Sequence, residues 1–411
     1  MQPEPKQHLG TPSIRIHRTS VRAAVLGALA AAVLVACSGG GGTGAAGNAP
    51  KNGAASKSAS AGITVTPDSG RAAKPGSKVT VRAHGGRLTE VKVTAPGADA
   101  FAGSLSKDGL IWTSTARLAP GTRYTVLARG EGTDGKPMSE RRTITTAKAG
   151  ETFVGEYFPD KGATVGVATP VSITFNKPIR DKAAVERGLT VTTSPTVEGA
   201  WSWMKDRDGK DRIDYRPRTF WKPATDVTVR MSLSGIDAGG GIYGTQQRVV
   251  HFRIGKAVVS TVDVRRKTMT VTENGTTLRT LPVSTGKPGF ETWNGTMVVL
   301  SKVPTIRMNS RTVGIFGPEA YNLGEVRWDV QLTPSGTYAH AAPWNDGKFG
   351  RINGSHGCIG MSTADAKWFY EHVGVGDPVT VVHSKDTVAV NNGYGDWNVA
   401  WPKWRAGSAL N

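Results

Sequence analysis

The chain has 411 residues, which is too long for one ordinary hydrophobic core and predicts roughly two to four domains. Hydrophobic residues make up 38% of the sequence, so a folded protein rather than a disordered one is expected beyond the glycine-rich start. The formal charge of +19 is compatible with anionic partners such as nucleic acid, acidic lipid headgroups or acidic wall polymers, but charge alone favours a solvated basic surface without a dedicated ligand.

Residues 1–36 predict a secretory signal segment. A basic stretch that ends at Arg22 runs into an apolar run at residues 23–36, which is too short for a membrane-spanning helix. The sequence LVA before Cys37 resembles the lipobox of bacterial lipoproteins, in which the cysteine is acylated and becomes the first mature residue. This resemblance implies an acyl chain such as palmitate on Cys37 and an extracytoplasmic location, anchored at the outer face of the cell membrane and facing the cell wall. Alternatively, Cys37 is an incidental residue of an ordinary signal peptide.

The chain contains two cysteines, Cys37 and Cys358. If Cys37 carries lipid, Cys358 has no partner for an intramolecular disulfide. An unpaired thiol outside the cytosol risks oxidation and mispairing, so its presence suggests a reactive role.

Residues 37–62 predict a lipid-anchored flexible linker, because the segment is rich in glycine, alanine and serine and has nothing to bury. Residues 63–149 and 150–256 contain short alternating segments rich in valine and threonine, separated by turn residues, which is typical of antiparallel sandwiches. A faint internal repeat, PGTRYTV at residue 120 and PATDVTV at residue 223, favours two tandem immunoglobulin-like domains.

Residues 257–384 predict a third domain that is β-rich, so the fold class of the whole chain is mainly β. Asn274-Gly275 between two alternating runs is a strong signal for a two-residue hairpin. One supporting helix is expected after Ser362, which can cap it together with Asp365. Residues 385–411 predict a C-terminal extension that packs on the third domain. Packing explains its three tryptophans with fewer assumptions than glycan binding does.

Cys358 lies in a glycine-rich turn, RINGSHGCIGMS, and is a candidate nucleophile. A thiol near its ordinary pKa is mostly protonated at neutral pH, so a nearby imidazole is the usual activator. Two histidines compete for this role, and we favour His340, at the end of a strand-like run, over His356, whose ring can point away from the sulfur. The turn allows the N–H groups of His356, Gly357 and Cys358 to face a developing oxyanion. A metal site fits worse, because one cysteine and two histidines make a thin ligand set.

His340 is followed, after 14 residues, by the sequence Ser-His-Gly-Cys-Ile at residues 355–359. This arrangement resembles the signature of bacterial L,D-transpeptidases, and the sequences AHAAPW, WFYEH and GYGDWNVAWPKW resemble the actinobacterial lipoprotein members of that family. Gly360 departs from the signature, which has asparagine at this position.

The resemblance implies a mechanism residue by residue. Cys358 would attack the third residue of a peptidoglycan tetrapeptide stem, expel the terminal D-alanine and form a thioester, with His340 relaying the proton and the Ala341 carbonyl orienting the imidazole. An amine of a neighbouring stem would then take the acyl group and give a 3→3 cross-link. The positions Tyr321, Met308, Trp344, Ser355 and Gly360 match the substrate-binding region of the family, although ordinary packing explains the first three as well.

The sequence therefore predicts a transferase of wall biogenesis and cell shape, with residues 257–384 as its catalytic domain. It is expected to need no cofactor or metal, to act on stem peptides rather than nucleic acid, and to be acylated by carbapenem-type β-lactams. An L,D-carboxypeptidase that uses water as acceptor and a non-catalytic wall-binding lipoprotein are the alternatives.

Overall fold

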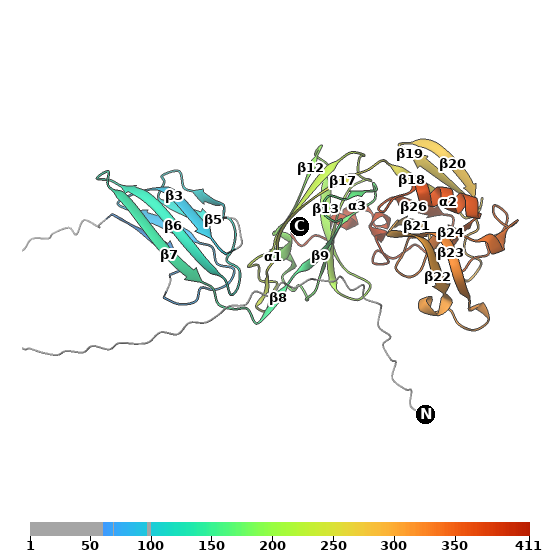
Figure 1. Cartoon of the computed structure of the whole chain (residues 1–411), viewed down its shortest axis with the longest axis horizontal. Helices are drawn as coiled ribbons and strands as arrows, with labels where there is room; N and C mark the ends of the chain where they lie inside the picture. The colour runs from blue at the N-terminus through green and yellow to red at the C-terminus, as the bar shows by residue number, and fades with distance from the viewer. Residues whose placement is uncertain (1–60, 69, 97–99) are drawn as a thin grey trace, which may run out of the picture. The chain divides into compact units, whose positions relative to one another are not determined.

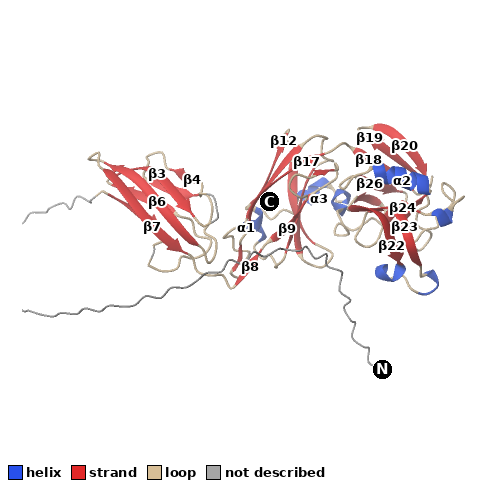
Figure 2. Cartoon of the chain, in the orientation of Figure 1, coloured by secondary structure: helices blue, strands red, loops and turns tan. Residues whose placement is uncertain are grey.

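The computed structural model describes residues 61–68, 70–96 and 100–411. The predicted signal segment, Cys37 and all but the end of the predicted linker lie outside these residues. Within them, strands dominate and helices are few and short, which confirms the mainly β fold class (Figure 2). No helix in this part of the chain is long and apolar enough to cross a membrane.

The first folded segment is a sandwich of two antiparallel sheets (Figure 1). Side chains alternate between buried and exposed along its strands, so that Tyr124, Val126 and Ala128 of one strand all reach the core. One sheet has the order β1-β2-β5-β4, with strands Gly62–Thr66, Thr80–His84, Ile111–Ser114 and Gly103–Leu105. The other has the order β3-β6-β7, with strands Gly86–Thr94, Arg123–Gly132 and Pro137–Thr145.

The second segment is also a sandwich, with a core that includes Phe153, Phe175, Ile213, Trp221 and Met231. One sheet has the order β10-β17-β15-β12 (Thr164–Val165, Gln247–Ile254, Asp226–Ser232, Leu189–Ser194). The facing sheet has the order β13-β14-β11-β9 (Gly199–Lys205, Asp211–Pro217, Val171–Phe175, Gly155–Phe158). A short pair, β8 (Glu151–Phe153) with β16 (Ile242–Gly244), and a short helix, α1 (Lys182–Glu186), complete it.

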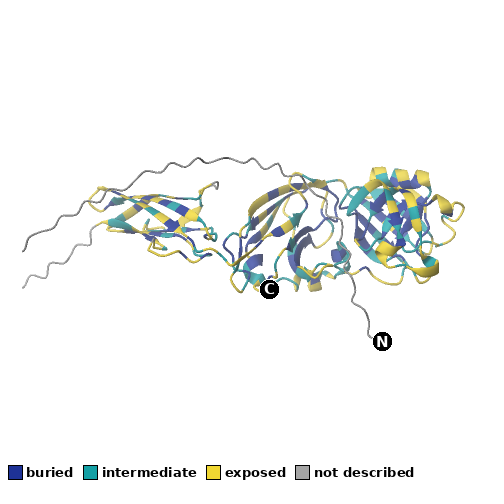
Figure 3. Ribbon diagram, turned by 60° about the horizontal axis from the view of Figure 1, so that its bottom comes forward, coloured by how far each residue is buried: buried dark blue, intermediate teal, exposed yellow. Residues whose placement is uncertain are grey.

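The third segment has its own core between two sheets and one helix, and the buried residues of each segment form a separate cluster (Figure 3). The five-stranded sheet runs β20-β19-β18-β26-β21 (Thr276–Pro282, Thr268–Glu273, Val258–Asp263, Pro378–Val382, Gly295–Val298). The four-stranded sheet runs β22-β23-β24-β25 (Ser301–Asn309, Asn322–Gln331, Tyr338–Ala341, Ile359–Met361). The remaining elements are α2 (Thr363–His372) and three 3-10 turns, η1 (Ser310–Val313), η2 (Gly317–Glu319) and η3 (Pro343–Asn345).

Two local predictions for the third segment are confirmed. Asn274 and Gly275 both have positive φ and connect β19 to β20, as a two-residue hairpin requires. The side chain of Ser362 accepts a hydrogen bond from the Asp365 N–H at 3.1 Å and caps α2.

The C-terminal extension contains η4 (Gly395–Asn398) and α3 (Trp401–Arg405), and it contacts both the third segment and the second sandwich. Asn398 does bond the backbone of Thr296 in the third segment, at 2.7 and 2.9 Å. The tryptophans, however, pack on the second sandwich. The indole of Trp404 donates to the carbonyl of Ala200 at 2.9 Å, and that of Trp397 donates to the carbonyl of Ala168 at 2.8 Å.

These tryptophans surround a buried arginine of the second sandwich. The guanidinium of Arg216 lies 4.9, 5.4 and 4.6 Å from the ring centres of Trp397, Trp401 and Trp404, within the range of cation–π attraction. The sequence did not predict this contact with the second sandwich, because nothing local to the tail indicates a partner about 200 residues earlier.

Replacing Trp404 by alanine should lower the free energy of unfolding by about 3–5 kcal/mol, because it empties a fully buried site and removes a bonded indole. Thermal or urea unfolding measures the loss. Trp344→Ala is the matched control, because Trp344 is 47% exposed and its loss should change stability by no more than about 0.5 kcal/mol. Equal effects of the two substitutions would contradict this packing.

Candidate active site

Cys358 is a free, buried cysteine directly before β25. Its side chain lies within hydrogen-bond distance of one backbone acceptor, the Gly336 carbonyl, at 3.6 Å from Sγ. The backbone N–H of Tyr338 also faces the sulfur, so the thiol lies beside the start of β24.

The parallel pairing of β24 with β25 brings His340 to the same region. Ala339 pairs with Ile359 and His340 pairs with Gly360. Because successive side chains of a strand point to opposite faces, Ala339 and Ile359 enter the core, whereas His340 and Cys358 both project from the other face. This shared face is called the site face below.

His340 is held in one tautomer by its own strand. Its Nδ1–H donates to the Ala341 carbonyl at 2.7 Å, which is the contact that the family resemblance implies. The second ring nitrogen, Nε2, is therefore the one able to accept a proton. Burial lowers the pKa of His340, and the bond to Ala341 partly offsets this effect.

Burial has the opposite effect on the thiol. It raises the pKa of Cys358 to about 11, the Tyr338 N–H lowers this value, and the charge of Asp329 raises it. Both groups of the pair are consequently neutral at physiological pH, and a thiolate forms only when a proton passes to an acceptor in the site.

His356 is directed elsewhere. Its Nε2–H donates to the Glu319 carboxylate at 2.7 Å, and Lys287 pairs with the same carboxylate oxygen at 2.6 Å. The ring also packs edge-on against Phe290 at 4.7 Å and lies 5.2 Å from the ring of Tyr321. A histidine fixed in this way fits a structural role better than that of the base.

The turn before Cys358 is closed by the Ser355 hydroxyl. It accepts from the Gly357 N–H at 3.1 Å and donates to the Cys358 carbonyl at 2.7 Å. Gly357 has φ of +110°, a conformation that favours glycine. The Gly357 N–H, one of the three predicted oxyanion donors, is therefore already bonded inside the turn. The N–H groups of His356 and Cys358 are the candidates that remain.

Gly360 is supported by backbone rather than by a side chain. It exchanges two hydrogen bonds with Ser284, at 2.8 and 2.9 Å. A Cβ at this position would lie 3.2 Å from the Cβ of Ala342, so a larger residue would crowd the strand. Asn353 braces the turn from the other side, accepting from the Thr285 N–H at 3.2 Å and donating to the Val264 carbonyl at 3.0 Å.

The three predicted pocket residues differ in position. Tyr321 lies at the site, since burial and the charge of Cys358 both raise its pKa. Trp344 is exposed, and its ring centre lies 5.9 Å from that of His340. Met308 is buried on β22 opposite Leu323.

Sequence reasoning missed Glu319, Asn353 and Asp329. Asn353 lies five residues before Cys358 and could have been considered for that reason, whereas Glu319 and Asp329 carry no local signal.

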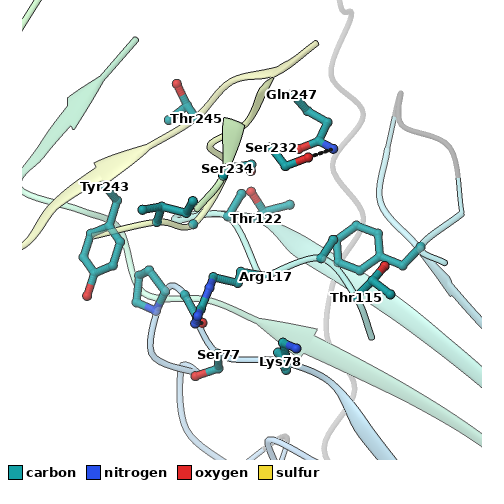
Figure 4. A pocket seen from close by; sticks show the side chains of 18 of the residues that line it. Ser77, Lys78, Thr115, Arg117, Thr122, Ser232, Ser234, Tyr243, Thr245 and Gln247 are labelled. Carbon is teal, nitrogen blue, oxygen red and sulfur yellow. Dashed lines mark hydrogen bonds between the residues drawn. The ribbon is translucent and has the colours of Figure 1, made fainter. Parts of the chain in front are cut away.

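A separate pocket, shown in Figure 4, is lined by residues of the two sandwiches such as Arg117, Ser232 and Tyr243. Its lining contains no cysteine or histidine, so it offers no comparable nucleophile.

The buried thiol, the tautomer-fixed imidazole on the same face and the glycine turn define a site for cysteine acyl transfer. The family comparisons agree with it. Residues 257–381 match the model of the L,D-transpeptidase catalytic domain, and residues 70–237 match that of a bacterial Ig domain.

Similar proteins cover most of the chain. L,D-transpeptidase 2 of Mycobacterium tuberculosis is 38% identical over 80% of this chain and 80% of its own length. L,D-transpeptidase 5 of the same species is 34% identical over 96% of this chain and 85% of its own length. A solved LD transpeptidase in complex with imipenem is 35% identical, with a TM-score of 0.49 over 56% of this chain and 99% of that one. The chain belongs to the bacterial L,D-transpeptidase family and is a transpeptidase with immunoglobulin-like domains.

The raised pKa of Cys358 predicts slow alkylation by iodoacetamide at neutral pH in the absence of substrate. The alkylation rate should keep rising above pH 9.0, the ordinary pKa of a thiol, until about pH 11. Mass spectrometry of the peptide that contains Cys358 follows the reaction. The same peptide in the unfolded chain is the control. If the alkylation rate of the folded protein levels off at a pH no higher than the midpoint measured for the unfolded chain, the result would contradict the burial effect.

Proposed function

We propose that the protein forms 3→3 cross-links in peptidoglycan through a thioester on Cys358. The observation that carries the proposal is the shared face of Cys358 and His340, with the imidazole held by Ala341 so that Nε2 is the proton acceptor. The family membership supports cross-linking of peptidoglycan as the general activity.

In the first half-reaction, Sγ of Cys358 attacks the carbonyl carbon of the third stem residue while its proton passes to Nε2 of His340. The oxyanion of the tetrahedral intermediate accepts hydrogen bonds from the N–H groups of His356 and Cys358. When the intermediate collapses, the bond from carbon to the nitrogen of D-alanine breaks, and the His340 imidazolium returns the proton to that leaving nitrogen.

In the second half-reaction, the amine of a neighbouring stem attacks the thioester carbon and gives up a proton to His340. The carbon–sulfur bond then breaks, and the proton returns to Cys358. Tyr321 and Trp344, which lie beside the two histidines, are positioned to contact the stem. Water in place of the amine would make the protein a carboxypeptidase, with the same residues in the same roles.

We further propose that Cys37 is acylated and anchors the chain at the outer face of the cell membrane. The lipobox-like sequence before Cys37 and the glycine-rich segment after it support this location.

Incubating the protein with disaccharide-tetrapeptide and weighing the products distinguishes these functions. Dimers that lack one D-alanine are expected, because the thioester is passed to an amine. Cys358→Ala should give no dimer. Cys37→Ser, assayed as soluble protein, is the control, because it removes the other cysteine and leaves Cys358 in place. Tripeptide alone would show hydrolysis, and unchanged products from Cys358→Ala would refute the role of the thiol.

Carbapenems should acylate Cys358. Structures of similar transpeptidases contain imipenem or a faropenem-derived adduct, which supports this proposal. Sulfur attack opens the lactam by breaking its carbon–nitrogen bond without expelling a fragment, so intact-protein mass should increase by the whole drug. The Cys358→Ala variant should gain nothing. An unchanged wild-type mass in excess drug would count against a competent site.

A further inference from the structure

Asp329 is a fully buried carboxyl that the mechanism above does not use. It lies near the end of β23 and is 0% exposed. Among the residues that the structure describes, neither carboxylate oxygen has a hydrogen-bond partner. Burying an unpaired carboxylate costs folding free energy, so a buried carboxyl without a partner needs a structural or functional explanation.

The strand register places Asp329 beside the reacting pair. Val330 pairs with Ala339, and Gln331 pairs with Tyr338. Extending this antiparallel register by one residue would set Asp329 opposite His340. Val330 and Ala339 both enter the core, so Asp329 projects from the opposite face, which is the site face that carries His340 and Cys358.

The neighbouring strand adds no charge of its own at this point. On β22, Val303 is the residue paired with Asp329. The basic side chains of the elements around β23 are all bonded elsewhere in the described structure. Lys302 bonds the carbonyls of Tyr370 and Val373, Arg307 bonds Asn322, Arg327 pairs with Glu325, and Lys367 pairs with Glu371.

Two titratable groups of the site are close enough to respond to the charge of Asp329: Tyr338 on β24 and Cys358 before β25. The charge of Asp329 raises the pKa of Cys358 and of Tyr338. Burial raises the pKa of Asp329 to about 7, so the carboxyl changes its charge within the range in which the enzyme would work.

We propose that Asp329 is a positioning residue that sets the charge state of the Cys358 thiol. When it is ionised, its negative charge opposes the thiolate and holds Cys358 as a thiol. When it is protonated, Sγ can lose its proton without that opposition. Asp329 exchanges no proton with either group and acts only through its field. The inference rests on the proposed function only in taking Cys358 as the nucleophile.

The direction of the pH effect follows from these charges. As the pH rises through about 7, Asp329 ionises and the thiolate becomes harder to form. The reactivity of Cys358 should therefore rise with pH less steeply than that of a thiol with no titrating neighbour. Removing the ionisable carboxyl should restore the steeper rise.

Alkylation of Cys358 by iodoacetamide, an uncharged probe, measures this effect in the full chain without any peptidoglycan substrate. Asp329→Asn should react as fast as wild type below about pH 6 and on the order of tenfold faster at about pH 8, because only wild type carries the opposing charge there. Rates that match wild type at every pH would overturn the proposal.

Asp377→Asn is the matched control. Asp377 is also a buried carboxyl of the third segment, burial raises its pKa to about 7 as well, and it accepts from the Gly374 N–H at 2.7 Å. Its substitution should leave the alkylation profile at the wild-type rate. A tenfold change in this variant too would overturn the proposal, since the effect would then belong to buried charge in general.

Wild type supplies a second test that does not depend on folding of the variant. The logarithm of its alkylation rate should rise with a slope clearly below one between about pH 6 and pH 8, and a slope of one would contradict the inference. A flattened wild-type slope together with no cross-linked product would retain the role of Asp329 and reject the proposed function instead.

Discussion

The parallel pairing of β24 with β25 is the constraint on which the site depends. It sets His340 opposite Gly360 and therefore two residues from Cys358, on the face away from the core. The same ladder fixes the Ala341 carbonyl next to Nδ1 of the imidazole, so register and tautomer are set together. A slip of one residue in either strand would turn the reacting side chain of that strand into the core.

Because Cys358 and His340 are both buried, their chemistry depends on the transfer of a proton between them rather than on a preformed ion pair. Burial raises the pKa of Cys358 and lowers that of His340, which keeps the pair neutral until a substrate arrives. The burial also protects the thiol, since the neutral form oxidises less readily than a thiolate. The backbone bonds between Gly360 and Ser284 and the bracing by Asn353 hold the turn without the asparagine of the family signature.

The sequence predicted what local patterns determine. The hairpin at Asn274-Gly275 and the helix capped by Ser362 need only a few neighbouring residues, and the nucleophile and base followed from a long motif. Pairings between distant segments were not predictable in this way. Trp404 meets Ala200, His356 meets Glu319, and Asp329 faces the site only because β22, β23 and β24 assemble in that order. Nothing in the residues around each of these positions specifies its partner.

The role of the β24–β25 register is tested most directly by comparing two histidines. The register brings His340 to Cys358 across the sheet, whereas His356 lies two residues before Cys358 in the sequence. The measurement is the rate at which a carbapenem acylates Cys358 in His340→Ala and in His356→Ala, followed by intact-protein mass. His340→Ala should be slower by on the order of a hundredfold or more, and His356→Ala should stay within about tenfold of wild type. The reverse order would contradict the account, because the base would then be the neighbour in sequence rather than the partner across the sheet.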